Sequence, residues 1–148
     1  PDDIITRGQL ASVVAGLMAA PFTAPSRASF TDVPTSSSIF AGVEEVAAAG
    51  VITACGSGRF CPNDPVSRAA GATFVRRARG LANVSSSATP SFVDVASSHW
   101  AFGGIEALYR AGHLSGCSAS PRRYCPDDGM TRAQAAVVLA RAFGLITP

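Results

Sequence analysis

The chain has 148 residues, 47% of them hydrophobic and 15% charged, and its formal net charge is +2. This length and composition predict a folded globular protein with a core of its own and argue against an intrinsically disordered chain. All twelve basic residues are arginines, and so mild a positive charge does not favour nucleic acid as a partner.

The first predicted helix runs from Arg7 to Ala20 and ends at Pro21. Its apolar residues recur at i, i+3, i+4 and i+7, the spacing of one buried helix face: Leu10, Val13, Val14 and Leu17. The apolar run that ends at Ala20 is too short to span a membrane, so we expect no membrane insertion.

The start of this helix carries a capping pattern that occurs three times along the chain. Thr6 and Gln9 have the spacing of a capping box, in which each side chain bonds the backbone N–H of the other residue, and Thr131 and Gln134 repeat it. The middle copy keeps the cap as Ser67 but has Ala70 in place of the second partner. We therefore expect the middle helix start to be weaker, by a few tenths to about 1 kcal/mol.

An arginine follows each cap, at Arg7, Arg68 and Arg132. A cation is disfavoured at a helix N-terminus, so three such arginines require a reason. One hypothesis is an anion site, in which each guanidinium and the free helix N–H groups together bind a carboxylate or phosphate. The alternative is that each arginine pairs with the acidic or Asn residues just before its cap and only holds the loop.

Two longer units are built on the same plan, and each opens with a Phe-x-Asp-Val turn, at Phe30 and at Phe92. Each unit is predicted to contain a first helix, a tight loop and a second helix, namely Ile39–Ala49 with Arg68–Arg79, and Trp100–Ala111 with Arg132–Phe143. The segment from Asn83 to Pro90 is a Ser-rich linker between the units.

The four cysteines form one pair per unit, Cys55 with Cys61 and Cys117 with Cys125. Cys117 follows Cys55 by 62 residues and Cys125 follows Cys61 by 64, so a two-residue insertion lies inside the second loop. Disulfides within each loop are the simplest interpretation and indicate an extracellular location. The alternative is a zinc site shared by all four cysteines, which the absence of close Cys-x-x-Cys pairs disfavours.

Catalysis is not expected. Neither histidine has a Ser, Cys or acidic partner at a spacing that suggests a triad. Glu44 and Glu106 occupy equivalent positions and so raise the alternative of a two-carboxylate glycosidase, but catalytic residues are normally unique and not repeated. We expect no enzyme, no catalytic residue, no metal ion and no cofactor.

Together these motifs resemble the S-layer homology repeat: Phe-x-Asp-Val, His99-Trp100-Ala101, a helix ending in Ala-Gly, an aromatic residue before Cys-Pro, and Thr131-Arg132-Ala133-Gln134. The resemblance implies an all-α fold of tandem helix-loop-helix repeats in a pseudo-threefold bundle, here with disulfide-closed loops. It divides the chain into the second half of a first repeat with a linker (1–29), a second repeat (30–89) and a third repeat (90–148), together one compact domain.

The resemblance also implies a function. It predicts a non-catalytic extracellular module, secreted or on the cell surface, that binds anionic and sometimes pyruvylated cell-envelope polysaccharide and anchors a protein there. The residues that it assigns to ligand binding are the caps and arginines, the single Trp and the Asp of each turn: Thr6, Arg7, Asp32, Arg68, Asp94, Trp100, Thr131, Arg132 and Gln134. Alternatives are a structural subunit of a surface layer or filament, and an accessory domain of a secreted hydrolase.

The first repeat is incomplete, because Pro1 corresponds to Pro62 and Pro126, each of which follows a cysteine. We expect another protein chain or an upstream domain to complete it, with a proteolytic or cloned fragment as the alternative.

Overall fold

The computed structural model describes residues 1–18 and 21–147. This part of the chain contains the helices α1 (Arg7–Met18), α2 (Phe40–Ala48), α3 (Arg68–Ala78), α4 (Phe102–Arg110) and α5 (Arg132–Ala142), with the strands β1 (Ser118–Ala119) and β2 (Arg122–Arg123). All five predicted helices are present within two residues of their expected ends, except that the expected end of the first, Ala19 and Ala20, lies outside the described residues. The expectation of a mostly helical protein is therefore confirmed.

The two strands were not predicted. They pair antiparallel as a small hairpin inside the second cysteine loop, where the sequence has its two-residue insertion. The first cysteine loop is shorter and carries only an isolated bridge between Gly56 and Arg59.

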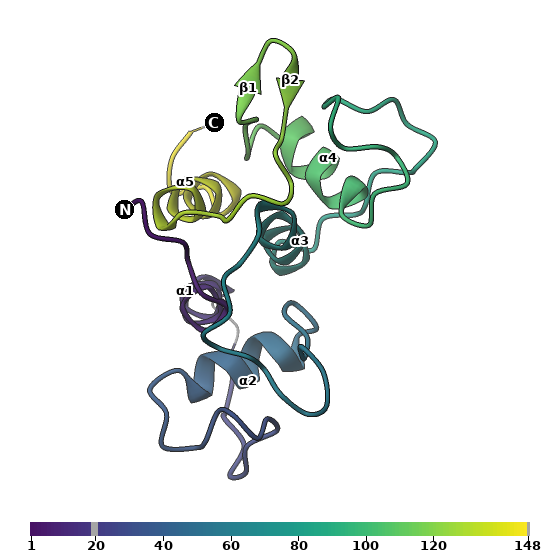
Figure 1. Ribbon diagram of the computed structural model, residues 1–148. Helices are drawn as coiled ribbons and strands as arrows, with labels where there is room; N and C mark the ends of the chain where they lie inside the picture. Colours follow the sequence, from purple (N-terminus) through teal and green to yellow (C-terminus); the bar gives the residue numbers. More distant parts are fainter. Residues whose placement is uncertain (19–20, 148) are drawn as a thin grey trace.

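The helices that follow the caps lie in the middle of the molecule. Figure 1 shows α1, α3 and α5 nearly end-on, with α2 on the outer side of α1 and α4 on the outer side of α3. Helix α2 approaches α1 closely because Gly42 has no side chain, and a Cβ there would lie 3.2 Å from the Cα of Ser12. Each helix before a cysteine loop thus packs on the post-cap helix that precedes it in the chain.

Backbone hydrogen bonds link the residues just before the three caps into a closed ring. Ile5 N–H donates to the Met130 carbonyl (2.9 Å), Met130 N–H to the Val66 carbonyl (2.8 Å), and Val66 N–H to the Ile5 carbonyl (3.0 Å). All three side chains are buried. Because buried backbone groups must find partners, this ring fixes how segments more than 60 residues apart in sequence meet.

The apolar core extends from this ring into both units. Its largest fully buried side chains include Phe60, Phe92, Phe102 and Tyr124. Phe60 packs edge-on against Phe30, and Tyr124 packs against Phe92, with ring centroids 5.4 Å apart in both pairs. The aromatic residue before each Cys-Pro therefore fills the core and attaches its cysteine loop to it.

Candidate functional site

The caps have the predicted geometry. Thr131 Oγ1 accepts from Gln134 N–H (3.1 Å), and Gln134 Oε1 accepts from Thr131 N–H (3.0 Å). Thr6 and Gln9 make the same two bonds. Ser67 accepts from the N–H of Ala70, which has no side-chain acceptor to return the bond. The middle cap is thus half of the box that the other two complete.

The helix N–H groups beside these caps already have partners, so the premise of free donors for an anion is wrong. The first N–H of each helix donates to a carbonyl of a neighbouring loop: Arg7 to Asp64, Arg68 to Asp128, and Arg132 to Asp3. The second N–H of each helix donates to a proline carbonyl: Gly8 to Pro62, Ala69 to Pro126, and Ala133 to Pro1. Since the cap side chain takes the third N–H, none of the three remains for a bound carboxylate or phosphate.

Two of the three arginines reach across to the next cysteine loop. Arg68 is only 7% exposed, and its guanidinium donates from Nε to the Tyr124 carbonyl (2.8 Å) and from Nη2 to the Ser115 carbonyl (3.1 Å). Its Cζ lies 4.5 Å from the centroid of the Tyr124 ring, and the Tyr124 hydroxyl donates back to the Arg68 carbonyl. Desolvation, opposed in part by the Arg68 charge, raises the pKa of Tyr124 to about 12, so the hydroxyl remains a donor.

Arg7 makes the equivalent contacts one repeat earlier. Its Nε donates to the Phe60 carbonyl (2.9 Å) and its Nη2 to the Thr53 carbonyl (2.6 Å). Among the described residues the ion pairs are Arg59 with Asp32 and Arg110 with Glu106, so pairing with the acidic residues just before the cap is wrong for Arg7 and Arg68. We call these two-bond contacts arginine hooks. They attach α1 to the first cysteine loop and α3 to the second.

Arg132 stands at the equivalent position on α5 but is exposed. Its backbone N–H bonds Asp3 as described, whereas its guanidinium makes no hydrogen bond or ion pair with any residue in 1–18 or 21–147. The three arginines differ in how many hydrogen bonds their guanidinium groups already make. Their predicted role in ligand binding stays a prediction.

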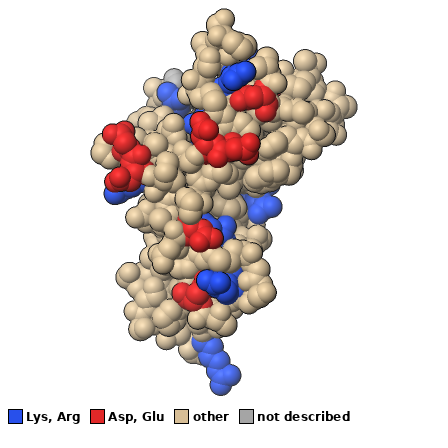
Figure 2. Space-filling model, viewed as in Figure 1, with Lys and Arg blue, Asp and Glu red and all other residues tan. Residues whose placement is uncertain are grey.

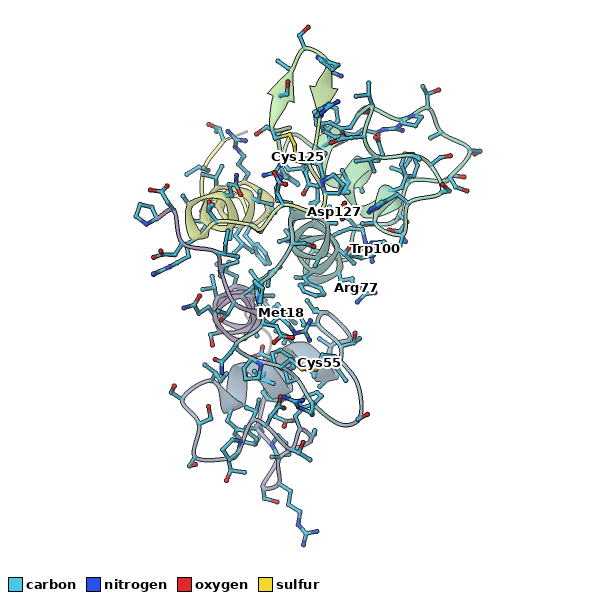
Figure 3. The ribbon with its side chains drawn as sticks, in the orientation of Figure 1. Met18, Cys55, Arg77, Trp100, Cys125 and Asp127 are labelled. Atoms are coloured by element: carbon cyan, nitrogen blue, oxygen red, sulfur yellow. A yellow bond between two sulfur atoms is a disulfide. The ribbon has the colours of Figure 1, made fainter. Side chains whose placement is uncertain are left out.

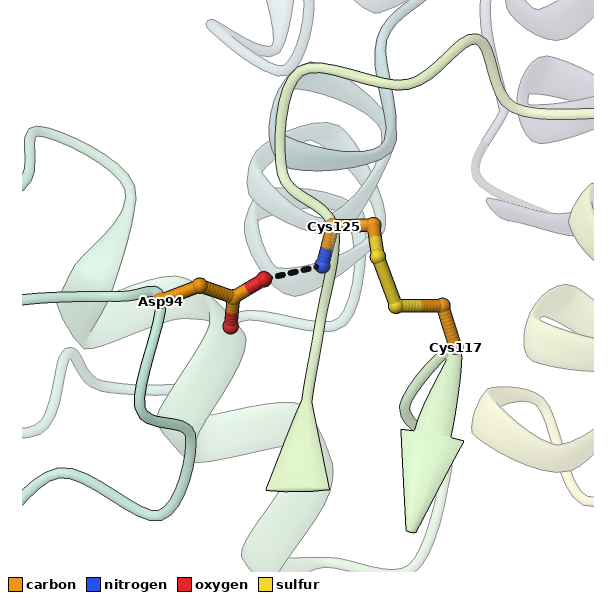
Figure 4. A group of neighbouring side chains, drawn as sticks. All are labelled: Asp94, Cys117 and Cys125. Carbon is orange, nitrogen blue, oxygen red and sulfur yellow. Dashed lines mark hydrogen bonds between the residues drawn. A yellow bond between two sulfur atoms is a disulfide. The ribbon is translucent and has the colours of Figure 1, made fainter. Parts of the chain in front are cut away.

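The Asp of each Phe-x-Asp-Val turn holds a cysteine loop. The two carboxylate oxygens of Asp94 accept from the N–H groups of Tyr124 and Cys125, both at 2.8 Å. Figure 4 shows the bond from Cys125. Asp32 does the same for Phe60 and Cys61. Although desolvation raises the pKa of Asp94, the two N–H donors outweigh it and hold that pKa below its usual value. The carboxylates are thus ionised clamps on the loops.

The cysteines form the two expected disulfides, Cys55 with Cys61 and Cys117 with Cys125. One shared zinc site is therefore wrong. Asp94 lies within 4.8 Å of both sulfurs of the second pair, but these sulfurs are bonded to each other and are not thiolates, the form that ligates a metal. Because both oxygens of Asp94 are also occupied, this group is a structural clamp and not a metal site.

A hollow of about 200 Å³ lies where α5 meets the second cysteine loop and the residues just before it. Its lining combines polar and cationic groups with an apolar floor and contains no acidic residue: Arg68, Leu114, Ser115, Tyr124, Met130, Gln134, Val137, Val138 and Arg141. The Nε of Arg141 is buried and has no hydrogen-bond partner among the described atoms. An anionic group that reached this wall would meet two guanidinium groups and no opposing carboxylate.

Comparison with known proteins gives the family. Residues 29–70 and 91–136 match the sequence profile of the S-layer homology domain. The chain belongs to the S-layer homology family. The two matched regions include both Phe-x-Asp-Val turns, which are among the motifs that suggested the resemblance.

Several relatives carry a similar region within much longer chains. The chain is 32% identical over 118 residues to a cell surface protein of Thermoanaerobacter kivui, covering 78% of this chain and 15% of that protein. It is 32% identical over 114 residues to an endoglucanase of Bacillus sp. (strain KSM-635), covering 77% and 12%. A surface-layer 125 kDa protein of Lysinibacillus sphaericus is 33% identical over 103 residues, covering 70% and 8%. The S-layer homology region is thus a small part of each relative.

The single Trp of the chain does not line this hollow. Trp100 precedes α4, is 67% exposed and stacks on His99, with ring centroids 5.7 Å apart. Figure 3 shows it on the α4 side of the molecule, away from α5. The predicted site residues therefore do not converge on one place: Arg68 and Gln134 line the hollow, whereas Trp100 forms a separate exposed surface.

Sequence reasoning missed Arg141 as a lining residue. The signal was present, because Gln134, Val137, Val138 and Arg141 fall at i, i+3, i+4 and i+7 and so share one face of α5. That face is the wall of the hollow.

Proposed function

We propose that this chain is a non-catalytic module that binds anionic cell-envelope polysaccharide and so anchors a protein at the cell surface. The protein is surface-associated or secreted, as its S-layer homology repeats and its cell-surface relatives indicate. The two disulfides agree with this location. No helix among the described residues is both long enough and apolar enough to cross a membrane.

The relatives support anchoring over catalysis. One is an endoglucanase and another a surface-layer protein, and yet both are similar to this chain over more than two thirds of its length. Proteins with such different activities have the matched region in common, so the common region is better suited to a shared location than to a shared reaction.

The hollow between α5 and the second cysteine loop supports an anionic sugar as ligand. Its lining combines Arg68, Arg141 and the Gln134 amide with apolar side chains and contains no acidic residue. We propose that a carboxylate of the polysaccharide, such as a pyruvyl group, bonds Arg141. Trp100 lies outside this hollow and presents a ring on which a second sugar of a long chain can stack.

The repeat order supports a pseudo-threefold domain. The ring of Ile5, Val66 and Met130 has one member from each of the three repeats, and we propose that their post-cap helices form the centre of a single compact domain. The repeats would then be 1–29, 30–89 and 90–148. Figure 2 shows small groups of mixed charge and no continuous basic surface on the face in view. A polymer bound there would be held by contacts with individual side chains and not by a broad positive field.

The test is a titration of the protein with isolated cell-wall polysaccharide. Binding is measured by calorimetry and by the fluorescence of Trp100, the only tryptophan in the sequence. Arg141→Gln should weaken binding about tenfold or more, because a hydrogen bond to a charged group contributes about 1.5–3 kcal/mol. Arg77→Gln is the matched control, since Arg77 holds the same place on α3 and does not line the hollow. Equal binding by both variants and the wild type would place the ligand elsewhere.

A further inference from the structure

Another hollow, of about 500 Å³, lies where the C-terminal ends of α3, α4 and α5 meet. We call it the C-terminal hollow. Three side chains that donate hydrogen bonds line it, one from or just after each helix end: Arg79, His113 and Arg141. The described residues of its lining include no acidic residue. It shares only Arg141 with the hollow between α5 and the second cysteine loop.

The nitrogen atoms of these side chains lack partners. His113 Nδ1 and Arg141 Nε are buried, and neither has a hydrogen-bond partner among the described atoms. The Arg79 guanidinium lies over the Phe143 ring, with Cζ 5.1 Å from the ring centroid, and makes no hydrogen bond or ion pair with residues 1–18 or 21–147. Buried polar groups are almost always paired, so two unpaired nitrogen atoms in the wall of one hollow indicate an acceptor from outside the chain.

The second unit is built differently at the equivalent place. Val51 stands where the third unit has His113, and it is only 2% exposed. Arg77 stands where α5 has Arg141, and its Nη1 donates to the Val51 carbonyl (3.4 Å). The second unit thus folds with an apolar side chain and a paired arginine at these two positions. The fold therefore does not require the imidazole or the unpaired guanidinium of the third unit.

The helix ends do not account for these side chains either. A cation near a helix C-terminus is favourable, and it can bond the free carbonyls of the last turn. Here a glycine with positive φ follows each helix and donates its N–H to a carbonyl of the last turn: Gly80, Gly112 and Gly144. Because the backbone closes these ends, the three side chains are not their caps.

We propose that the C-terminal hollow binds a phosphate group. A phosphate presents its oxygen acceptors in a tetrahedral arrangement, so donors that come from three helix ends reach different oxygens. A carboxylate has two oxygens in one plane, which suits donors from one side. Guanidinium groups fit phosphate well, because their planar fork donates to two oxygens at once. The phosphate gives His113 Nδ1 and Arg141 Nε the acceptor that the chain does not supply.

The rest of the hollow suits the carbon part of a phosphate ester. Leu145 and Ile146 belong to its lining and are 64% and 47% exposed, so apolar surface lies beside the donors. The ligand is therefore a phosphate group, either free or carried on an ester. This inference does not rest on polysaccharide binding, because two of its three donors, Arg79 and His113, lie outside the other hollow.

The experiment titrates the oxidised protein in turn with sodium phosphate, glycerol 3-phosphate and sodium pyruvate, at constant pH and ionic strength. Nuclear magnetic resonance follows the ring signals of the two histidines. His99 stacks on Trp100 outside the hollow and is the internal reference. Phosphate should shift the His113 signals in a saturable way and leave those of His99 unchanged. Tighter binding of glycerol 3-phosphate than of phosphate would identify an ester as the ligand, and equal or weaker binding would identify the free ion.

His113→Val is the sharpest variant, because it puts the second unit's residue into the third. With the amide signal of Gly144 as reporter, it should weaken phosphate binding about tenfold. It should not lower the urea midpoint of the free protein, since it removes a buried nitrogen that has no partner. Arg79→Gln should weaken phosphate binding by a similar factor. Arg77→Gln is the matched control and should leave it unchanged, because Arg77 is on the same helix end and does not line the hollow.

Three results would overturn the proposal. The first is a His113 signal that moves no further with phosphate than with sodium chloride of the same ionic strength. The second is binding of pyruvate as tight as that of phosphate, which would refute the choice of phosphate. The third is undiminished phosphate binding by both His113→Val and Arg79→Gln, which would place the ligand elsewhere. No polysaccharide is present in this assay, so its failure would leave the proposed anchoring function untouched.

Discussion

The arginine hooks predict that the same substitution is strongly destabilising at one of two equivalent positions and nearly neutral at the other. Arg68→Ala removes a nearly buried guanidinium that donates to the carbonyls of Tyr124 and Ser115, in and just before the second cysteine loop. Arg132→Ala removes an exposed guanidinium that bonds none among the described residues. Because both arginines follow a cap at the same helix position, the comparison isolates the hook.

The size of the effect follows from the contacts. Each hydrogen bond from a charged group contributes about 1.5–3 kcal/mol, and the contact with the Tyr124 ring adds about 0.5–2 kcal/mol. Since a helix N-terminus disfavours a cation, part of this gain is offset. We expect Arg68→Ala to lower the free energy of unfolding by about 3–5 kcal/mol, out of the ~5–15 kcal/mol typical of a domain. Arg132→Ala should change it by less than about 0.5 kcal/mol.

Urea unfolding followed by far-ultraviolet circular dichroism measures both variants under the same oxidising conditions. Arg7→Ala should resemble Arg68→Ala, because it loses two equivalent bonds. Comparable midpoints for Arg68→Ala and Arg132→Ala would refute the assignment of the hook as a stabilising contact.

Predictions for four further substitutions follow from the geometry. Ala70→Gln should complete the middle capping box and raise the free energy of unfolding by a few tenths to about 1 kcal/mol, measured by urea unfolding. Because the N–H donors hold the pKa of Asp94 below its ordinary 3.8, the stability that its carboxylate contributes is present above that value and is lost as pH falls through the lowered pKa. Asp94→Asn should therefore be less stable at pH 7 and lose less on acidification, and parallel acid titrations of the two proteins would contradict this. Gly116→Ala should destabilise by about 1–3 kcal/mol, because its Cβ would meet the Arg123 carbonyl, whereas Gly16→Ala, with open space on α1, should stabilise by about 0.5–1 kcal/mol in the same thermal melts.

The helices and caps could be predicted from sequence because their signals are local. Thr131 and Gln134 lie three residues apart, and the apolar spacing after them needs no knowledge of the rest of the chain. The disulfides could be predicted because the repeat assigns one cysteine pair to each unit. The starts of α2 and α4 were less certain, since their first turns have no side-chain cap, and Trp100 precedes α4 where a helix was expected.

The hooks and the backbone ring could not be predicted, because their acceptors are main-chain carbonyls. Every residue has a carbonyl, so nothing in the sequence marks Tyr124 or Ser115 as the partner of an arginine 56 or 47 residues earlier. The acidic residues before each cap illustrate the same limit. Asp3, Asp64 and Asp128 contact the starts of α5, α1 and α3, none of which is the helix that follows them in the chain. They do so with their carbonyl oxygens, whereas their carboxylates had been expected to act.

The candidate site likewise contains residues that the sequence suggested and one that only the three-dimensional structure reveals. Asp32 and Asp94 were assigned to ligand binding from the resemblance, and in the structure their oxygens accept hydrogen bonds from the loops. Arg141 was overlooked because it stands at a repeated position that Arg77 also occupies, and only the three-dimensional arrangement puts one of the two beside a hollow.

The most direct measurement of the central claim is co-sedimentation of the oxidised protein with two preparations of the same cell walls, one intact and one stripped of its anionic polysaccharide to bare peptidoglycan. The account predicts that the protein sediments with intact walls, is released by added free polysaccharide, and stays in solution with stripped walls. Equal sedimentation with both preparations, or with neither, would contradict it.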